Sequence, residues 1–178
     1  HFKKCIDNLI HLKSLEDVYS CKLEYDVPSV NSKGSKKCDI VILKTGRPYI
    51  VFPVKFIMSN YYQNRNNYWE NQTGEIMHMV WENSDLIIIP INLIFNEVPY
   101  LSENKIIRFE TITYRKTFKI YDILITNNII EDVINIIVDV AHECEVGDIY
   151  DKCPNILGIN QYTPYRTFEE ILSRLLSM

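Results

Sequence analysis

The sequence predicts an α/β domain with a central mixed β-sheet flanked by helices. Apolar residues recur at helical intervals over residues 1–20 and 59–83, whereas short apolar runs typical of buried strands lie between and after these segments. Over residues 1–95 the predicted order is α-β-β-β-α-β. With 178 residues, of which 47% are hydrophobic, the chain is expected to form one domain, in which residues 96–178 elaborate a core built from residues 1–95.

The charge and cysteine content exclude several classes of protein. Lys and Arg number 19 against 23 Asp and Glu, so the net charge is −4 and any nucleic-acid site has to rest on a local basic patch. The five cysteines are odd in number and form no CxxC pair, which argues against a zinc knuckle and a disulfide framework. Because no apolar run reaches the length of a membrane span, the prediction is an intracellular, cytoplasmic protein without a membrane partner.

The first elements alternate between helical and extended patterns. Residues 1–20 place apolar residues at helical spacing, and residues 21–30 alternate before a turn of composition NSKGSKK. The run CDIVIL (38–43) predicts a strand that ends at KTGRP, and YIVFPVKFIM (49–58) predicts a second buried strand. Pro53 lies within this second run, and because proline has no backbone N–H, it predicts an edge position or a bulge there.

Residues 59–83 predict one long helix, because they lack proline and their apolar residues return about every seven positions. The apolar stripe consists of Tyr62, Trp69, Ile76 and Val80. At roughly 100° per residue, a polar flank of the same helix lies beside this stripe and close to the core. The flank consists of Gln63, Asn67, Glu70 and Gly74.

The second half of the chain predicts further strands and two helices. The run SDLIIIPINLIF (84–95) is typical of a strand covered on both faces. Residues 105–125 are rich in Ile, Thr, Phe and Tyr, which predicts one or two strands. Residues 127–143 have helical spacing, and residues 165–178 predict a final amphipathic helix capped by Thr167.

The segment 36–55 contains two apolar runs, and each run carries one charged residue of interest. Asp39 begins the first strand of this segment, and Lys55 lies near the end of the second. Together with the order of elements, this arrangement resembles the PD-(D/E)XK nuclease superfamily, which includes the type II restriction endonucleases. The resemblance covers residues 1–95 and implies a restriction-endonuclease-like core, in which two diverging strands bring an acid beside an acid-x-lysine triplet.

The resemblance implies a role for each of these residues. Asp39 matches the first acid, and it would hold Mg²⁺ or Mn²⁺ with help from the Val54 carbonyl, since hard cations prefer oxygen ligands. Lys55 matches the lysine that orients the attacking water and stabilises charge on the phosphoryl oxygens. Position 53, where the family has its second acid, is a proline in this chain.

Another carboxylate therefore has to complete the predicted site. Some restriction enzymes that resemble this pattern take a glutamate from the following helix, and Glu70 lies fifteen positions after Lys55 on the polar flank of that helix. We expect Glu70 to be the second catalytic acid and metal ligand. Glu75 on the same helix and Glu24 on the first strand are the alternatives.

A small set of polar residues near these strands is suited to nucleic acid. Lysines before Asp39 suit a phosphate backbone, while amides and an arginine at the head of the long helix suit base edges and phosphates. A solvated helix flank and ordinary surface lysines are the alternative interpretation. The predicted nucleic-acid-binding residues are Lys36, Lys37, Gln63, Asn64, Arg65 and Asn67.

The predicted function is a Mg²⁺-dependent endodeoxyribonuclease of the restriction type, which hydrolyses double-stranded DNA. Cutting both strands calls for two sites, so a homodimer is expected, with its interface in the long helix or in the C-terminal helices. The first alternative is a catalytically inactive nucleic-acid-binding or scaffolding domain that lost its acid at Pro53. An RNA endonuclease of the same superfamily is the second.

Overall fold

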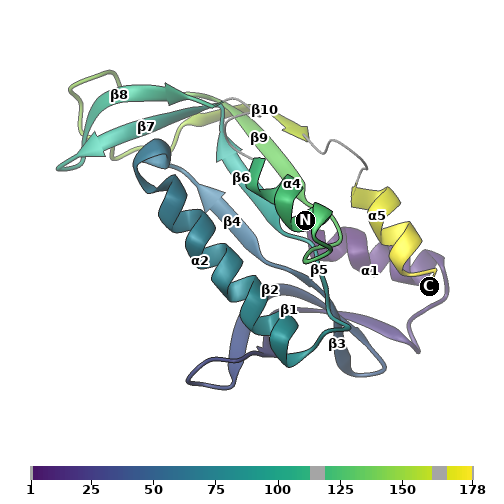
Figure 1. The fold of residues 1–178 in the computed structure, drawn as a ribbon. Helices are drawn as coiled ribbons and strands as arrows, with labels where there is room; N and C mark the ends of the chain where they lie inside the picture. Colours follow the sequence, from purple (N-terminus) through teal and green to yellow (C-terminus); the bar gives the residue numbers. More distant parts are fainter. Residues whose placement is uncertain (1, 113–118, 162–167, 178) are drawn as a thin grey trace.

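The chain is a mixed α/β protein in which helices flank sheets of mixed strand direction (Figure 1). The computed structural model describes residues 2–112, 119–161 and 168–177. The helices in this part of the chain are α1 (Phe2–Leu12), α2 (Tyr61–Glu82), α4 (Lys119–Thr126) and α5 (Phe168–Leu175). Figure 1 shows α2 along the sheet strands and α1 beside α5 at the other side of the molecule.

The first sheet has the strand order β1-β2-β3-β5. Its strands are β1 (Tyr19–Pro28), β2 (Ser35–Lys44), β3 (Arg47–Phe52) and β5 (Ile87–Ile88). The first three are antiparallel neighbours, whereas β5 pairs with β3 in parallel after the chain has crossed over through α2. Helices and strands up to residue 95 therefore follow the order predicted from the sequence, with two of the strands interrupted.

The second sheet has the order β10-β9-β6-β4, and a separate hairpin joins β7 and β8. The bounds are β4 (Val54–Ile57), β6 (Ile91–Phe95), β7 (Glu97–Ser102), β8 (Lys105–Thr111), β9 (Ile134–Ala141) and β10 (Asn155–Gln161). β4, β6 and β9 are parallel neighbours, and β10 is antiparallel to β9. Apolar side chains from both sheets and from all four helices form one buried core.

Proline causes both interruptions. Pro53 separates β3 from β4, and Pro90 lies between β5 and β6. β3 pairs with β2 as far as Phe52, which lies opposite Ile40, and beyond Pro53 the chain pairs with β6 instead. Pro53 thus marks the point where a strand passes from an inner position in one sheet to the edge of the other, rather than a bulge within one strand.

One prediction for the second half of the chain is wrong. Residues 134–141, predicted as helix, form β9, because INIIVDVA is a run of mostly β-branched residues buried between β6 and β10. In residues 105–125, where one or two strands were predicted, one is present as β8, while Lys119–Thr126 forms the helix α4, which buries Tyr121 and Leu124 three positions apart. β7 and β10 were not predicted. The last helix is confirmed as α5, while Thr167 lies outside the described residues.

The face that α2 buries differs from the predicted stripe. Its buried residues are Tyr61, Gln72, Ile76 and Met79, so Ile76 alone is shared with the prediction. The polar Gln72 occupies a core position, and for that reason a search for apolar periodicity misplaces the stripe. The predicted polar flank instead faces solvent, with Gln63, Asn67 and Glu70 exposed.

The β7–β8 hairpin fixes the start of α2. The Tyr62 backbone N–H donates to the buried Glu110 carboxylate at 3.0 Å, and Arg108 donates to the same carboxylate at 3.1 Å. The Asn60 side chain bonds the backbone of Leu101. A carboxylate at a helix N-terminus satisfies a free N–H and interacts favourably with the helix dipole.

No helix in the described ranges is long and apolar enough to cross a membrane.

Candidate functional site

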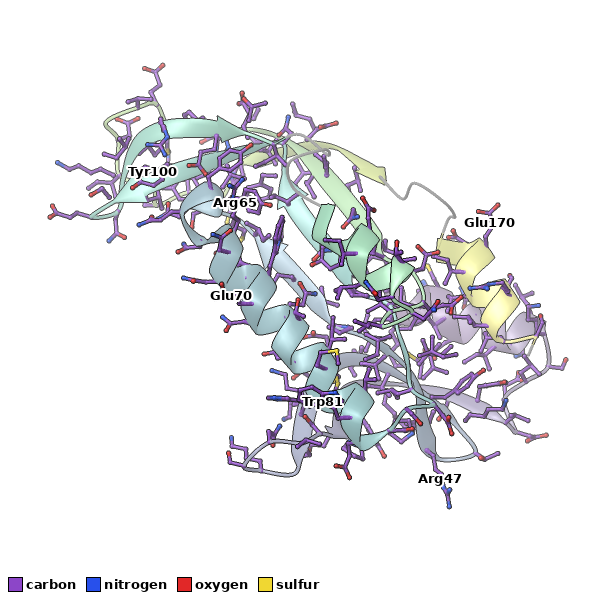
Figure 2. The ribbon with its side chains drawn as sticks, in the orientation of Figure 1. Arg47, Arg65, Glu70, Trp81, Tyr100 and Glu170 are labelled. Atoms are coloured by element: carbon purple, nitrogen blue, oxygen red, sulfur yellow. The ribbon has the colours of Figure 1, made fainter. Side chains whose placement is uncertain are left out.

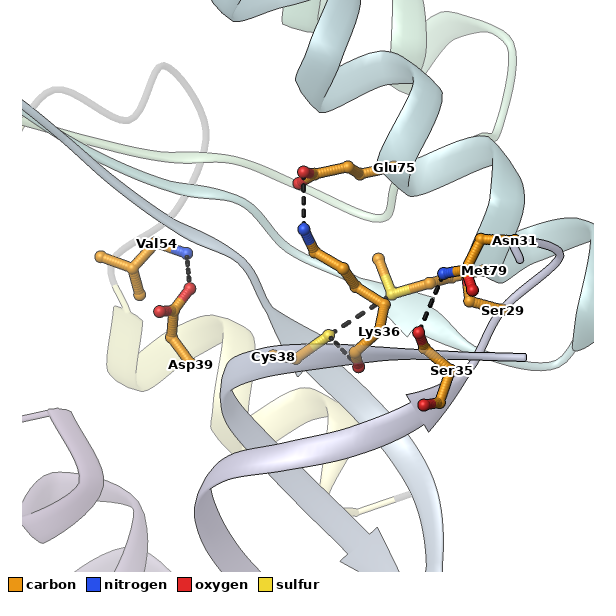
Figure 3. A network of polar contacts seen from close by, with 9 residues as sticks. All are labelled: Ser29, Asn31, Ser35, Lys36, Cys38, Asp39, Val54, Glu75 and Met79. Carbon is orange, nitrogen blue, oxygen red and sulfur yellow. Dashed lines mark hydrogen bonds and ion pairs between the residues drawn. The ribbon is translucent and has the colours of Figure 1, made fainter. Parts of the chain in front are cut away.

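Asp39 lies where β2 and the β3–β4 strand separate. Its Oδ2 accepts a hydrogen bond of 2.8 Å from the Val54 backbone N–H (Figure 3). Pro53 has no N–H, so the Val54 N–H is the first backbone donor after the break between β3 and β4. The Asp39 carboxylate accepts from this donor in place of a backbone carbonyl of a neighbouring strand. The divergence of two strands therefore holds an exposed carboxylate beside the backbone of β4.

A cleft of about 230 Å³ opens at this point between β2, β4 and α2. It brings together the predicted Asp39, Val54 and Lys55 with the two predicted basic residues of β2. The complete lining is Lys36, Lys37, Cys38, Asp39, Pro53, Val54, Lys55, Tyr68, Asn71, Gln72, Glu75 and Met79. Three lysines and two acids give the cleft a positive balance, although the whole chain carries a net charge of −4.

Lys55 is half-buried on β4 and faces α2. Its Nζ lies 5.0 Å from the centroid of the Tyr68 ring, within the range of a cation–π interaction. The ring restricts where the long lysine side chain can lie, and the ammonium group stays on the wall of the cleft. The geometry thus places the Lys55 ammonium group in the same cleft as the Asp39 carboxylate.

Glu75 is the acid that α2 contributes to the cleft. Its Oε1 accepts from the Lys36 Nζ at 2.6 Å (Figure 3). Both side chains are partly exposed, and ion pairs of this kind are typically worth about 0–1 kcal/mol. A divalent cation can therefore displace Lys36 from Glu75 at low cost. An anion that binds Lys36 can likewise displace Glu75 from the lysine.

The other two candidate acids lie elsewhere. Glu70, on α2 between Arg65 and Trp81 (Figure 2), lines a separate hollow with Asn66, Trp69, Thr73 and Gly74. Glu24 is exposed on β1 and is not part of the cleft lining. Of the three acids predicted as substitutes for the carboxylate missing at position 53, Glu75 is the one that the structure places with Asp39 and Lys55.

The predicted nucleic-acid-binding residues divide into two groups. Lys36 and Lys37 line the cleft. The group at the head of α2 lies outside the cleft lining, beside the β7–β8 hairpin, where the Arg65 guanidinium stacks 5.7 Å from the Tyr62 ring centroid. This second group consists of Gln63, Asn64, Arg65 and Asn67.

A buried polar network behind the cleft was not predicted. The Tyr121 hydroxyl lies 2.5 Å from Gln72 Oε1 and 2.9 Å from Asn92 Oδ1, and Asn92 bonds Asn135 at 2.8 Å. Asn92 and Asn135 are partners in the register of β6 and β9. A signal was present, because each asparagine stands among apolar residues of its strand, and a buried amide requires hydrogen-bond partners.

Cys38 lies on the cleft wall but is not suited to chemistry there. Burial raises the pKa of its thiol to about 12, and its Sγ contacts the Met79 sulfur and the Lys36 carbonyl. A thiol needs to ionise to act as a nucleophile or as a metal ligand. The reactive groups of the cleft are therefore its carboxylates and amines.

The cleft offers hard oxygen donors to a cation. Within the described ranges, no group of three or more His, Cys, Asp or Glu side chains lies close enough to hold a metal ion. Mg²⁺ retains several waters, however, and is commonly bound through one or two carboxylates. Asp39 and Glu75 each make one hydrogen bond or ion pair through a single oxygen to a described residue, which leaves the second oxygen for a cation. The donor chemistry therefore fits Mg²⁺ or Mn²⁺.

Comparisons of the chain with known protein families, with curated proteins and with solved structures gave no match. Its function is therefore inferred from the cleft.

Proposed function

We propose that this protein is a Mg²⁺-dependent endodeoxyribonuclease of the restriction type with a restriction-endonuclease-like core. The observation that carries the proposal is that Asp39, Lys55 and Glu75 line one cleft at the point where β2 leaves the β3–β4 strand. Diverging strands that bring an acid beside a lysine are the feature expected from the sequence resemblance. The α-β-β-β-α-β order of the first half supports the same core.

Each cleft residue has a distinct chemical task in this proposal. Asp39, Glu75 and the Val54 carbonyl would hold the cation, which when bound supplies Lewis-acid polarisation of a phosphoryl oxygen. The Lys55 ammonium would orient the attacking water and stabilise negative charge that develops on the phosphate. Lys36 and Lys37 would contact the DNA backbone, and Glu75 takes the role that the sequence resemblance gave to Glu70.

Cleavage of plasmid DNA in Mg²⁺ and in Mn²⁺ tests the proposal. The parent protein is expected to produce discrete fragments, and Lys55→Met and Glu75→Gln are expected to abolish cutting. Glu70→Gln provides a matched comparison on the same helix and is expected to retain activity, because Glu70 lies outside the cleft. Activity that survives Glu75→Gln but not Glu70→Gln would contradict this assignment of the second acid.

A non-catalytic nucleic-acid-binding domain is the second candidate. Two observations favour it: position 53 supplies no carboxylate, and Glu75 is paired with Lys36. This candidate predicts that the protein binds DNA without cutting it under any metal condition. RNA included in the same assay distinguishes an RNA endonuclease from a DNA endonuclease.

We also propose a homodimer, since cutting both strands requires two clefts. β10 is an edge strand of its sheet and exposes Ile156, Leu157 and Ile159. This edge is a better dimer contact than the helices predicted from the sequence, because exposed apolar side chains on an unpaired edge favour strand addition. Sedimentation analysis of the parent and of Leu157→Lys tests it, and a monomeric parent would exclude it.

A further inference from the structure

Gln72 is a buried amide that borders the cleft. Its residue exposure is 7%, and it lines both the cleft and a small inner hollow that includes Lys55, Asn92 and Tyr121. The other buried residues of α2 are Tyr61, Ile76 and Met79. A polar side chain buried among these neighbours requires partners, and Gln72 has one on its oxygen side.

The hydrogen bonds of Tyr121 give this network a direction. A tyrosine hydroxyl has one proton, so it cannot donate both to Gln72 and to Asn92. If the proton goes to Gln72, rotating the Asn92 amide presents its nitrogen to the Tyr121 oxygen. A matching rotation of Asn135 lets its side-chain nitrogen donate to the Asn92 oxygen, and places the Asn135 oxygen where its nitrogen otherwise lies buried without a partner. The chain of donors then runs from Asn135 through Asn92 and Tyr121 to Gln72.

This direction leaves the side-chain nitrogen of Gln72, a residue that lines the cleft, as the unbound end of its amide. The oxygen of the amide is bound by Tyr121 in the core, and within the described part of the chain the nitrogen makes no hydrogen bond. Its two N–H groups are therefore available to an acceptor in the cleft, which Glu75 lines from the same helix and Lys55 from β4.

We infer that the Gln72 side-chain amide donates a hydrogen bond to a phosphodiester oxygen in the cleft, with Tyr121 as the positioning residue that holds the amide in this orientation. The inference deepens the proposed function and rests on it for the class of ligand. A phosphodiester fits because its oxygens only accept, and three lysines of the cleft attract its charge. The amide adds a directional contact that lysine side chains do not provide.

Nuclear magnetic resonance on the whole chain tests the inference with two small probes. The first is the dinucleotide TpT, which has one phosphodiester, and the second is its neutral methylphosphonate analogue. The Gln72 side-chain N–H pair is assigned by its loss in Gln72→Met. TpT is expected to shift this pair and the amides of the cleft, whereas the analogue is expected to produce a much smaller shift. Tyr121→Phe is expected to remove the shift of Gln72 while the Lys55 backbone amide still responds.

The result that overturns the inference is a TpT response of the cleft amides with no response of the Gln72 pair, or an equal response in Tyr121→Phe. Either result leaves the proposed nuclease intact, because plasmid cleavage tests that separately. If neither probe shifts any residue of the cleft, the phosphodiester contact is excluded. Tyr19→Phe is a matched control, because Tyr19 is a buried tyrosine on β1 outside the cleft lining, and it is expected to respond as the parent does.

Discussion

Pro53 and Pro90 lie opposite each other, at the breaks between β3 and β4 and between β5 and β6. Ile50 pairs with Ile87 before the prolines and Val54 with Ile91 after them, so the register continues unchanged across both breaks. The Ile91 N–H donates to the Pro53 carbonyl at 2.8 Å, which joins the two strands at this level. The pairing of β3 with β2 ends just before Pro53, and the pairing of β6 with β9 begins just after Pro90. The two prolines therefore mark the boundary between the two sheets, and the cleft opens at this boundary.

A carboxylate restored at position 53 is expected to strengthen metal binding. Pro53 lines the cleft, so Pro53→Glu adds an oxygen ligand beside Asp39 and Glu75. Two unit charges 4 Å apart attract by about 1 kcal/mol in water, and a divalent cation doubles this, which corresponds to a gain of roughly tenfold or more in Mn²⁺ affinity. Titration calorimetry measures it, with Pro53→Gln as the neutral control. Equal affinities in the two variants would show that position 53 does not reach the cation.

Removal of Lys36 is expected to strengthen Mn²⁺ binding, because the lysine competes for Glu75 and repels a cation. Their ion pair is partly exposed, and at about 0–1 kcal/mol its loss corresponds to at most about a fivefold gain for Lys36→Met. The same substitution is expected to weaken DNA binding. Lys33→Met, in the exposed loop before β2, is the control. A fall in Mn²⁺ affinity on Lys36→Met would mean that the lysine positions Glu75 rather than competes for it.

The sequence was sufficient for the order of helices and strands in the first half, because long helical segments alternate there with short apolar runs. It was not sufficient for β9, whose residues 134–141 suit a helix by spacing but a covered parallel strand by their β-branched side chains. In the site, Asp39 and Lys55 were found because charged residues in apolar strands are conspicuous. The choice between Glu70 and Glu75 depended on the rotation of α2, which the buried Gln72 sets and which apolar periodicity misjudges.

Tyr121→Phe is expected to lower the free energy of unfolding by about 1–3 kcal/mol. The hydroxyl bonds Gln72 and Asn92 in the core, and its removal deprives each of these buried amides of one hydrogen bond. Urea denaturation of the parent and the variant measures the difference. Tyr19→Phe, at another buried tyrosine, is the control and is expected to have a smaller effect, because no hydrogen bond to a described residue is known for its hydroxyl. Equal losses would show that the network adds no specific stability.

Glu110 is expected to be essential for the order of the first turn of α2. Glu110→Leu removes the acceptor for the Tyr62 N–H and leaves Arg108 without its carboxylate, at a cost of about 1–3 kcal/mol. Glu110→Gln keeps an oxygen acceptor and is expected to cost less. Hydrogen exchange of the Tyr62 amide reports the local effect, and Glu97→Leu, at an exposed position of β7, is the control. Unchanged protection of Tyr62 in Glu110→Leu would show that the cap is not needed.

The protein is expected to lose stability as the pH rises above about 9. Burial raises the pKa of Cys38 from its ordinary value of 9.0 to about 12 and that of Cys21 to about 11, so the native state keeps protons that the unfolded chain releases. The stabilisation is complete below pH 9 and falls by at most about 1.4 kcal/mol per pH unit for each thiol above it. Urea midpoints under reducing conditions at several alkaline pH values measure this slope. Cys38→Ala is expected to flatten it, whereas Cys153→Ala, at an exposed thiol, is expected to leave it unchanged. A slope that Cys38→Ala does not alter would mean that this thiol ionises equally in both states.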